Sequence, residues 1–252
     1  ERAKDEAEEP LLTESFDKCD FSQGWNGSFV RSELYPRGTG PFASFAGHGC
    51  VLHQYIPDNS NETTSAQAGV EGSAAFAQIT GMPFVDEFYI EWQEYFPEDH
   101  DFADGSQKMM RFTYYEPGEE DSSEINLTTQ NENTNIQLFL YHPRGSDGEA
   151  IDLFVNTGIA IPTGRWVTFA VWAKLNSPGE NDGFARAYMD GVEIAALEDI
   201  SNRGWDTRGW NIMWVGGNHT NDSETTQASS RYLDNIRWYA AKPDVDLLAR
   251  EQ

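Results

Sequence analysis

Residues 87–96 of this chain alternate polar and apolar side chains, so hydrogen-bonding groups can gather on one face of a strand. Successive side chains of an extended strand point to opposite faces, so one face collects the polar set. That face holds Glu87, Tyr89, Glu91, Gln93 and Tyr95. Carboxylates, phenols and an amide together suit a groove that hydrogen-bonds hydroxyl groups. The alternative is an ordinary solvent-exposed sheet face.

The run 107–115 supplies cations that could bind an anionic substrate. Strict alternation along this run places Lys108 with Met110 on one face and Arg111 with Met109 on the other. We therefore expect only one of the two cations to face a groove. The alternative reading of Lys108 is a solvated or ion-paired lysine in a chain rich in carboxylates.

Two further stretches carry groups that could transfer protons. In residues 137–143, Gln137, Phe139 and Tyr141 fall on one face of a predicted strand. His53 lies in the alternating run 51–55, and an imidazole changes its charge near neutral pH, so His53 is a candidate base.

The elements that must position these residues are short alternating strands, and no convincing amphipathic helix occurs among them. The runs lie near residues 28–34, 49–55, 69–80, 86–96, 107–115, 124–130, 136–142, 151–155, 165–175, 184–189, 192–197, 210–216 and 231–240. Residues 165–175 and 184–189 are separated by a stretch rich in Asn, Pro and Gly, and the second run ends at Asp190-Gly191, a pair favoured in tight hairpins. This pattern predicts an all-β sandwich or barrel. We expect a single domain over residues 13–242, with a frayed tail at 1–12 and a C-terminal tail at 243–252.

Composition limits the partners. The 252 residues carry a formal charge of −25, which argues against nucleic acid, anionic membrane surfaces and heparin-like ligands as bulk electrostatic partners. An acidic polysaccharide could bind only through a local basic patch. The chain has eight Trp, ten Tyr and fifteen Phe despite a mean hydropathy of −0.61, and aromatic rings serve sugar-binding clefts as stacking platforms. Ordinary strand packing explains most of these rings equally well.

The two cysteines, Cys19 and Cys50, show no metal-binding spacing. We expect them to form one disulfide that ties the first strands together, which implies an oxidising compartment. No run approaches the roughly twenty apolar residues needed to cross a bilayer. The expected location is therefore secreted or extracellular, with the periplasm as an alternative.

Two segments resemble jelly-roll polysaccharide lyases. The C-terminal half of these lyases has a similar order of elements. Here that order is Trp166 with its strand, then Leu175-Asn-Ser-Pro-Gly179, then a second strand that ends at Asp190-Gly191. Upstream, Tyr95-Phe-Pro-Glu-Asp-His-Asp-Phe102 followed by Gly105-Ser-Gln-Lys108 resembles a segment of alginate and glucuronan lyases. This resemblance spans roughly residues 85–240 and implies an all-β, concanavalin-like jelly roll with two curved antiparallel sheets and a concave groove.

The resemblance also implies a reaction and roles for individual residues. These lyases cleave uronic-acid polymers by β-elimination, in which the sugar carboxylate is neutralised, a base removes the C5 proton and an acid protonates the leaving oxygen. Lys108 would neutralise the carboxylate, Tyr141 would act as base or acid, and Gln137 or Gln93 would hydrogen-bond the carboxylate. The chain departs from these families in residues 125–130, where the family arginine is missing.

Two other functions remain open. A non-catalytic carbohydrate-binding module would use aromatic rings as stacking surfaces, namely Tyr89, Tyr95, Trp172 and Tyr141. A glycoside hydrolase of the laminarinase type would use Glu87 and Glu91, although Tyr89 replaces the central acid of that pattern.

A structural calcium ion is a further expectation, because jelly rolls often join their first and last strands through hard oxygen ligands. Asp234 resembles the usual C-terminal donor, and Glu14 or Asp17 would supply the other end. The alternative for Asp234 is a hydrogen-bond acceptor at a strand end or turn. The predicted chemistry itself requires no cofactor.

Overall fold

The structure is a computed structural model, and it describes only part of the chain. The described residues are 9–19, 29–30, 37, 40–45, 47–57, 65–68, 84–102, 106–113, 124–130, 135–142, 151–203, 209–215 and 226–243. The run near 69–80, which the sequence predicts as a strand, lies outside these residues, as do residues 1–8 and 244–252 of the predicted tails.

All regular structure in the described residues is β-strand. The strands are β1 (Leu12–Glu14), β2 (Phe29–Val30), β3 (Phe42–Phe45), β4 (Gly49–Ile56), β5 (Ser65–Ala68), β6 (Glu87–Tyr95), β7 (Ser106–Thr113), β8 (Glu124–Gln130), β9 (Asn135–His142), β10 (Ile151–Asn156), β11 (Trp166–Lys174), β12 (Gly183–Met189), β13 (Val192–Ile200), β14 (Ile212–Val215) and β15 (Ser229–Tyr239). Among the described residues, no helix is long and apolar enough to cross a membrane.

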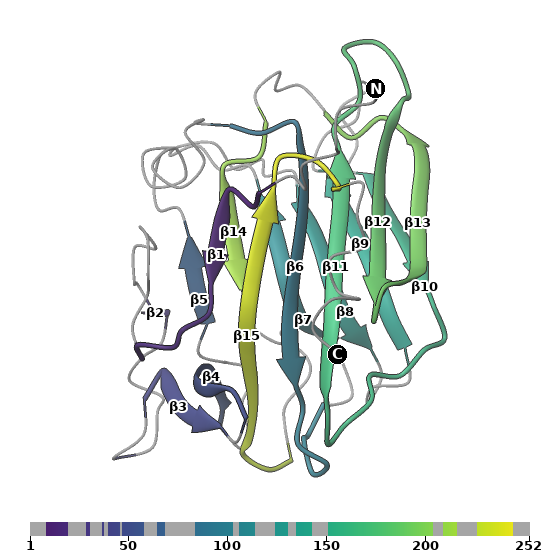
Figure 1. Cartoon of the computed structure of the whole chain (residues 1–252). Coiled ribbons are helices and arrows are strands. Elements are labelled where there is room, and N and C mark those ends of the chain that lie inside the picture. Colours follow the sequence, from purple (N-terminus) through teal and green to yellow (C-terminus); the bar gives the residue numbers. More distant parts are fainter. Residues whose placement is uncertain are drawn as a thin grey trace, which may run out of the picture.

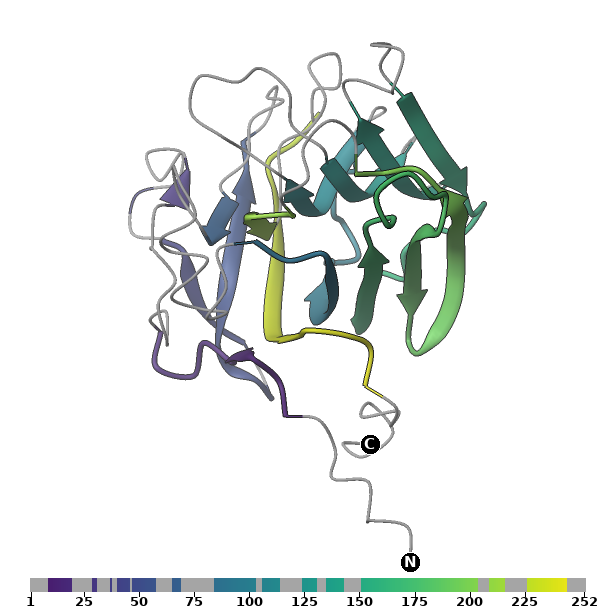
Figure 2. The ribbon, with the colours of Figure 1, turned by 90° about the horizontal axis from the view of Figure 1, so that it is seen from above.

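The strands form two antiparallel sheets that lie in two layers, as Figures 1 and 2 show. The eight-stranded sheet has the order β13-β12-β11-β6-β15-β4-β3, with β1 also paired to β15. The seven-stranded sheet has the order β10-β9-β8-β7-β14-β5-β2. The predicted all-β class with two antiparallel sheets is therefore confirmed.

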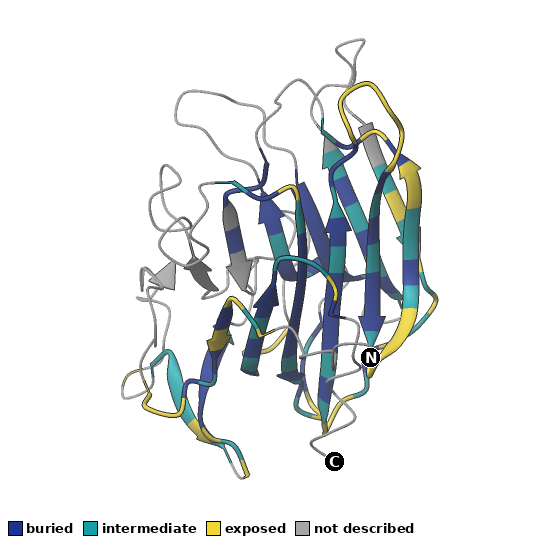
Figure 3. Cartoon of the chain, turned by 45° about the horizontal axis from the view of Figure 1, so that its top comes forward, coloured by how far each residue is buried: buried dark blue, intermediate teal, exposed yellow. Residues whose placement is uncertain are grey.

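The core lies between the two layers, where alternate side chains of each strand meet. In β6 the core side holds Phe88, Ile90 and Trp92, all fully buried, while β9 contributes Ile136, Leu138 and Leu140 from the opposite sheet. Figure 3 shows that burial is greatest along the central strands and declines towards β13. The outer faces are therefore the surfaces on which a binding site can form.

The hairpin between β12 and β13 follows the sequence prediction. Asp190 and Gly191 both have positive φ angles, 49° and 78°, which is the backbone that a two-residue hairpin of the favoured twist requires. Val192 follows directly and pairs with Met189. This turn places β12 and β13 side by side at the edge of the eight-stranded sheet.

One ion pair lies in the core between the sheets. Arg231 on β15 is fully buried, and its Nη1 lies 3.3 Å from Oε1 of the equally buried Glu94 on β6. Arg231 also donates to Gln54 Oε1 at 2.6 Å and to the main-chain carbonyl of Lys108 at 2.7 Å. Because Lys108 belongs to the other sheet, Arg231 joins the two layers through the interior.

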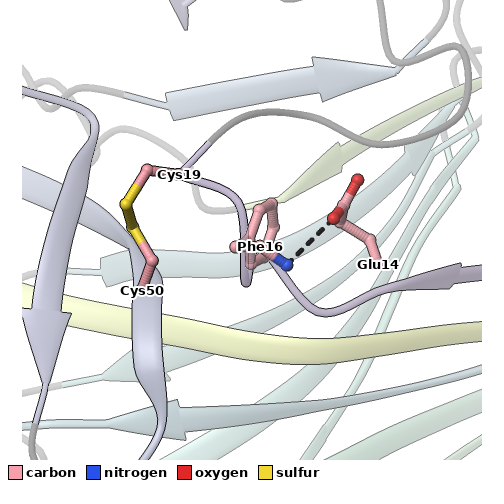
Figure 4. The surroundings of a disulfide bond; sticks show 4 residues. All are labelled: Glu14, Phe16, Cys19 and Cys50. Atoms are coloured by element: carbon pink, nitrogen blue, oxygen red, sulfur yellow. Dashed lines mark hydrogen bonds between the residues drawn. A yellow bond between two sulfur atoms is a disulfide. The ribbon is translucent and has the colours of Figure 1, made fainter.

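The predicted disulfide between Cys19 and Cys50 is present, and Figure 4 shows its surroundings. The bond joins the segment that follows β1 to β4, with the two Cα atoms 5.3 Å apart. Nearby, the main-chain N–H of Phe16 donates to Glu14 Oε1 at 2.9 Å. The start of the fold is thus held to the eight-stranded sheet by a covalent bond and by the pairing of β1 with β15.

Candidate functional site

The outer face of the seven-stranded sheet carries three rows of side chains that cross β7, β8 and β9. Residues that face each other across antiparallel strands point to the same side of the sheet. The rows are Lys108, Thr128 and Gln137; Arg111, Asn126 and Phe139; and Thr113, Glu124 and Tyr141. Two cations, two amides, three hydroxyl groups, a carboxylate and a phenyl ring therefore share this face, which we call the polar face.

A β-bulge brings both cations to the polar face. Lys108 is opposite Thr128, but Met110 is opposite Leu127, so Met109 is an extra residue without a facing partner on β8. Both methionines point into the core and are fully buried. The sequence prediction that only one cation can face the groove was wrong, because the bulge interrupts the alternation on which it depended.

Arg231 supports this bulge from the interior. Its hydrogen bond to the carbonyl of Lys108 satisfies a main-chain acceptor next to the register shift. A bulge disrupts the regular ladder of strand hydrogen bonds, so a buried donor at this position stabilises it. The backbone that presents Lys108 and Arg111 is therefore fixed from behind.

The electrostatics of the polar face centre on Glu124. Arg111 forms an ion pair with Glu124, and the Asn126 side chain donates to Glu124 Oε1 at 2.5 Å. Glu124 is only 7% exposed, so this pairing is shielded from solvent. Burial lowers the pKa of Lys108, while the nearby Glu124 raises it and Arg111 lowers it further. A lysine in this setting loses its proton at a lower pH than a lysine in water.

Lys108 and Tyr141 share the polar face but do not stand side by side. They are two strands and four residues apart, which corresponds to about 16 Å between their Cα atoms at ordinary strand spacing and rise. Arg111 lies in the row between them, about 12 Å from Tyr141 on the same basis. The row of Arg111 therefore lies between the row of the lysine and the row of the phenol.

The polar stripe predicted on β6 lies on the outer face of the other sheet. Its members and Trp172 on β11 point away from the core that Phe88, Ile90 and Trp92 fill. The structure therefore places Glu87, Tyr89, Glu91, Gln93, Tyr95 and Trp172 on the opposite side of the molecule from Lys108, Gln137 and Tyr141. These two groups of predicted site residues cannot line one groove.

The predicted groups on that other face are engaged with neighbouring side chains. Trp172 Nε1 donates to Glu87 Oε1 at 3.0 Å, and Arg237 Nη1 lies 3.4 Å from Glu91 Oε1. The Asn235 side chain donates to Gln93 Oε1 at 2.7 Å. Glu87 and Glu91 are four residues apart on one strand, so their backbones are separated by about 13 Å. The carboxyl groups would have to lean together to reach the spacing that glycoside hydrolysis needs.

His53 also lies on the outer side of the eight-stranded sheet. Its ring stacks on Tyr232 with 5.2 Å between centroids, its Nε2 lies 2.8 Å from Ser230 Oγ, and its Nδ1 lies 3.1 Å from the carbonyl oxygen of Gly40. Burial lowers the pKa of His53, partly offset by the contact with Gly40. Because the core separates His53 from Lys108 and Tyr141, the three residues are not brought together.

Of the residues proposed for calcium, Glu14 does not approach Asp234, whereas Asp17 lies close enough that its charge, after the larger effect of burial, raises the pKa of Asp234. Glu14 pairs in register with Ile236 and points into the core, whereas Asp234 lies on the outer side and contacts His48 Nδ1 at 2.7 Å. In the described part of the chain, no group of three or more His, Cys, Asp or Glu side chains is placed to hold a metal ion. A structural calcium ion stays a prediction, and no step of the chemistry is derived through a metal.

Sequence reasoning missed five members of the polar face, namely Arg111, Thr113, Glu124, Asn126 and Thr128. That Glu124, Asn126 and Thr128 share one face of β8 could have been anticipated from their alternation with Ile125 and Leu127. The position of Arg111 could not, because a bulge of two adjacent methionines has no distinctive sequence signal.

Comparison with known proteins identifies the fold. No family model matches the sequence, and a search of the curated proteins finds no similar sequence. Among solved structures, alginate lyase vAL-1 from Chlorella virus has a TM-score of 0.63 at 13% identity, covering 91% of this chain and 98% of that chain. Endo-β-1,4-glucuronan lyase from the fungus Trichoderma reesei has a TM-score of 0.62 at 14% identity, covering 91% and 94%.

A carbohydrate-binding domain is also similar. Domain 4 of AbnA, an extracellular arabinanase from Geobacillus stearothermophilus, was solved in complex with arabinotriose. It has a TM-score of 0.53 at 16% identity, covering 94% of this chain and 95% of that chain. At these identities, similarity establishes architecture. The chain therefore has the concanavalin-like jelly-roll fold that is also found in glucuronan and alginate lyases.

Proposed function

We propose that this protein binds a uronate-containing polysaccharide on the polar face and cleaves it by β-elimination. The observation that carries this proposal is the presence of Lys108 and Arg111 on one face, which also carries the amide of Asn126 and the phenol of Tyr141. The chain as a whole carries a charge of −25, so an acidic polymer needs such a local concentration of positive charge.

The order of the rows supports a division of labour. Arg111 and Asn126 lie in the middle row, where a guanidinium and an amide would bind the sugar carboxylate and stabilise the charge that develops when the C5 proton leaves. Lys108 lies on one side of this row, and its lowered pKa suits a base. Tyr141 lies on the other side and would supply a proton, for which its side chain and that of Lys108 have to lean toward the middle row from opposite sides to reach the same C4–C5 bond.

The reaction balances without water or an oxidant. The C5–H bond breaks, its proton passes to the Lys108 amine, and its electron pair forms the C4–C5 double bond. The C4–O bond breaks at the same time, and the Tyr141 phenol protonates the leaving oxygen. Before the next turnover, the proton on Lys108 returns to Tyr141 through solvent.

The experiment measures the double bond that elimination creates. Purified protein is incubated with alginate or glucuronan while the ultraviolet absorbance of the unsaturated product is followed. Arg111→Ala is expected to lower the rate by about 10²–10³-fold, and Tyr141→Phe by about 10²–10⁴-fold. Arg165→Ala is the matched control, because Arg165 pairs with Asp190 on the other sheet, and it is expected to retain the wild-type rate. Full activity in both Arg111→Ala and Tyr141→Phe would overturn the assignment.

A non-catalytic carbohydrate-binding module is the second candidate. It is favoured by the ion pair that already occupies Arg111 and by the likeness to an arabinanase domain with a bound trisaccharide. Retention on immobilised polymer without unsaturated product would support this function. Reducing ends released without the ultraviolet signal would instead support hydrolysis by Glu87 and Glu91.

We place this activity outside the cell. The disulfide between Cys19 and Cys50 supports an oxidising compartment, and polysaccharides of this kind are extracellular substrates. Detection of the protein in culture medium rather than in the cell fraction is the expected result.

A further inference from the structure

The polar face continues beyond its charged centre to an exposed phenylalanine. Phe154 on β10 is 54% exposed and is the one aromatic side chain among those described that lies largely in solvent. Its neighbours Leu153 and Val155 pack against the core, so Phe154 points outward from the polar face. In the strand register, Phe154 is opposite Phe139 on β9, and Phe139 is opposite Asn126 on β8.

An uncharged ladder of amides runs beside this phenylalanine pair. The Gln130 side chain donates to Gln137 Oε1 at 3.0 Å, and Gln137 donates to Asn156 Oδ1 at 2.9 Å. Asn135 also donates to Asn156 Oδ1, at 2.6 Å. Primary amides offer both donors and acceptors, which is what sugar hydroxyl groups require.

We propose that Phe154 and Phe139, together with the amides of Gln137 and Asn156, form a sugar-binding subsite for a pyranose unit remote from the reacting bond. This subsite rests on the proposed function, because its occupant is the same polysaccharide that Arg111 binds. An aromatic ring packs against the apolar C–H face of a pyranose while the amides bind its hydroxyl groups.

The register gives the direction of the bound chain. Arg111, Asn126, Phe139 and Phe154 form one continuous row across β7, β8, β9 and β10. Three strand spacings separate its ends, which is about 14 Å. A polysaccharide lying across the strands therefore reaches from the cationic centre to Phe154, whereas a short oligosaccharide held at Arg111 stops before it. The subsite carries no charge among these residues, so it accepts neutral and acidic pyranoses alike.

The experiment compares substrate lengths in the variant Phe154→Ala. The KM for alginate or glucuronan polymer is expected to rise about tenfold, while the kinetics of the matching trisaccharide change by less than twofold. Phe154 is largely exposed, so its truncation leaves the core intact. Val192→Ala is the matched control, because Val192 is 65% exposed and lies on the other sheet.

Binding measurements separate this proposal from the catalytic one. Affinity electrophoresis of the wild type and Phe154→Ala in gels that contain the polymer reports binding without cleavage. Weaker retention of Phe154→Ala supports the subsite even if no unsaturated product forms, whereas equal retention and equal KM values overturn it. An equal loss for trisaccharide and polymer also overturns it. So does a wild-type dimer that Phe154→Ala dissociates in sedimentation experiments, since Phe154 would then contact a second copy of the chain.

Discussion

Replacing Arg231 with methionine removes the cation that joins the two sheets. Glu94 then remains in the core without its partner, while Gln54 and the Lys108 carbonyl each lose a donor. Removing one member of a buried ion pair typically destabilises a protein by about 3–5 kcal/mol. We expect Arg231→Met to lower the free energy of unfolding by at least that amount at neutral pH.

The pH dependence of this loss follows from Glu94. Burial raises the pKa of Glu94, and Arg231 partly offsets this effect. Without Arg231 the pKa rises further, so the folded protein binds a proton at a pH where the unfolded chain does not. Stability then falls as pH rises above the ordinary glutamate pKa of about 4.3. The deficit of Arg231→Met relative to wild type should therefore be largest near pH 7 and should shrink towards pH 5.

Urea unfolding at the two pH values measures this deficit. The double variant Glu94→Leu with Arg231→Met should regain the share of the free energy of unfolding that the unpaired carboxylate costs. The remaining loss should be about 1–3 kcal/mol for each acceptor left without a donor, which are Gln54 Oε1 and the Lys108 carbonyl. Arg165→Met is the matched control, because its pair with Asp190 is exposed, and it should change stability by about 1 kcal/mol or less. A deficit below about 1 kcal/mol for Arg231→Met, or one that grows towards acid pH, would refute the reasoning.

Three other predictions concern titration and cross-linking. If Lys108 is the base, kcat/KM should increase as the pH rises through the lowered pKa of Lys108, and Lys108→Arg should abolish this increase. A kcat/KM that instead declines over the same pH range would mean that Lys108 acts as a cation. Burial lowers the pKa of His100 to about 4, so the unfolded chain binds the proton first as pH falls below the ordinary value of 6.5. The free energy of unfolding should therefore fall by about 3 kcal/mol between pH 6.5 and 4, and His100→Gln should flatten this slope in urea titrations. Replacing Cys19 and Cys50 with alanine removes a cross-link that spans 31 residues, which should lower the free energy of unfolding by about 3–4 kcal/mol; an unchanged urea midpoint would contradict this expectation.

The strands that alternate strongly could be predicted from the sequence. The predicted runs 165–175 and 184–189 correspond to Trp166–Lys174 and Gly183–Met189, and the turn at Asp190-Gly191 forms as expected. The short strands Phe42–Phe45 and Ser65–Ala68 were missed. The first is only four residues long, and the second consists of Ser, Ala and Gln, so neither shows the apolar periodicity that marks a strand.

The location of the candidate site could be predicted only in part. Alternation correctly placed Gln137, Phe139 and Tyr141 on one face of β9, because that strand has no irregularity. It gave no information on which strands share a sheet, since β6 and β7 are adjacent in sequence but belong to different layers. Pairing of this kind depends on long-range contacts that a local pattern does not encode.

The position of β15 has a consequence for biosynthesis. This strand, the last along the described part of the chain, is inserted between β6 and β4 and also pairs with β1, so the eight-stranded sheet stays divided until residues 229–239 leave the ribosome. Until then the nascent chain exposes unpaired backbone on β6 and β4, which can recruit strands from neighbouring polypeptides. A holding chaperone should therefore raise the soluble yield, and a stop codon before Ser229 should give inclusion bodies.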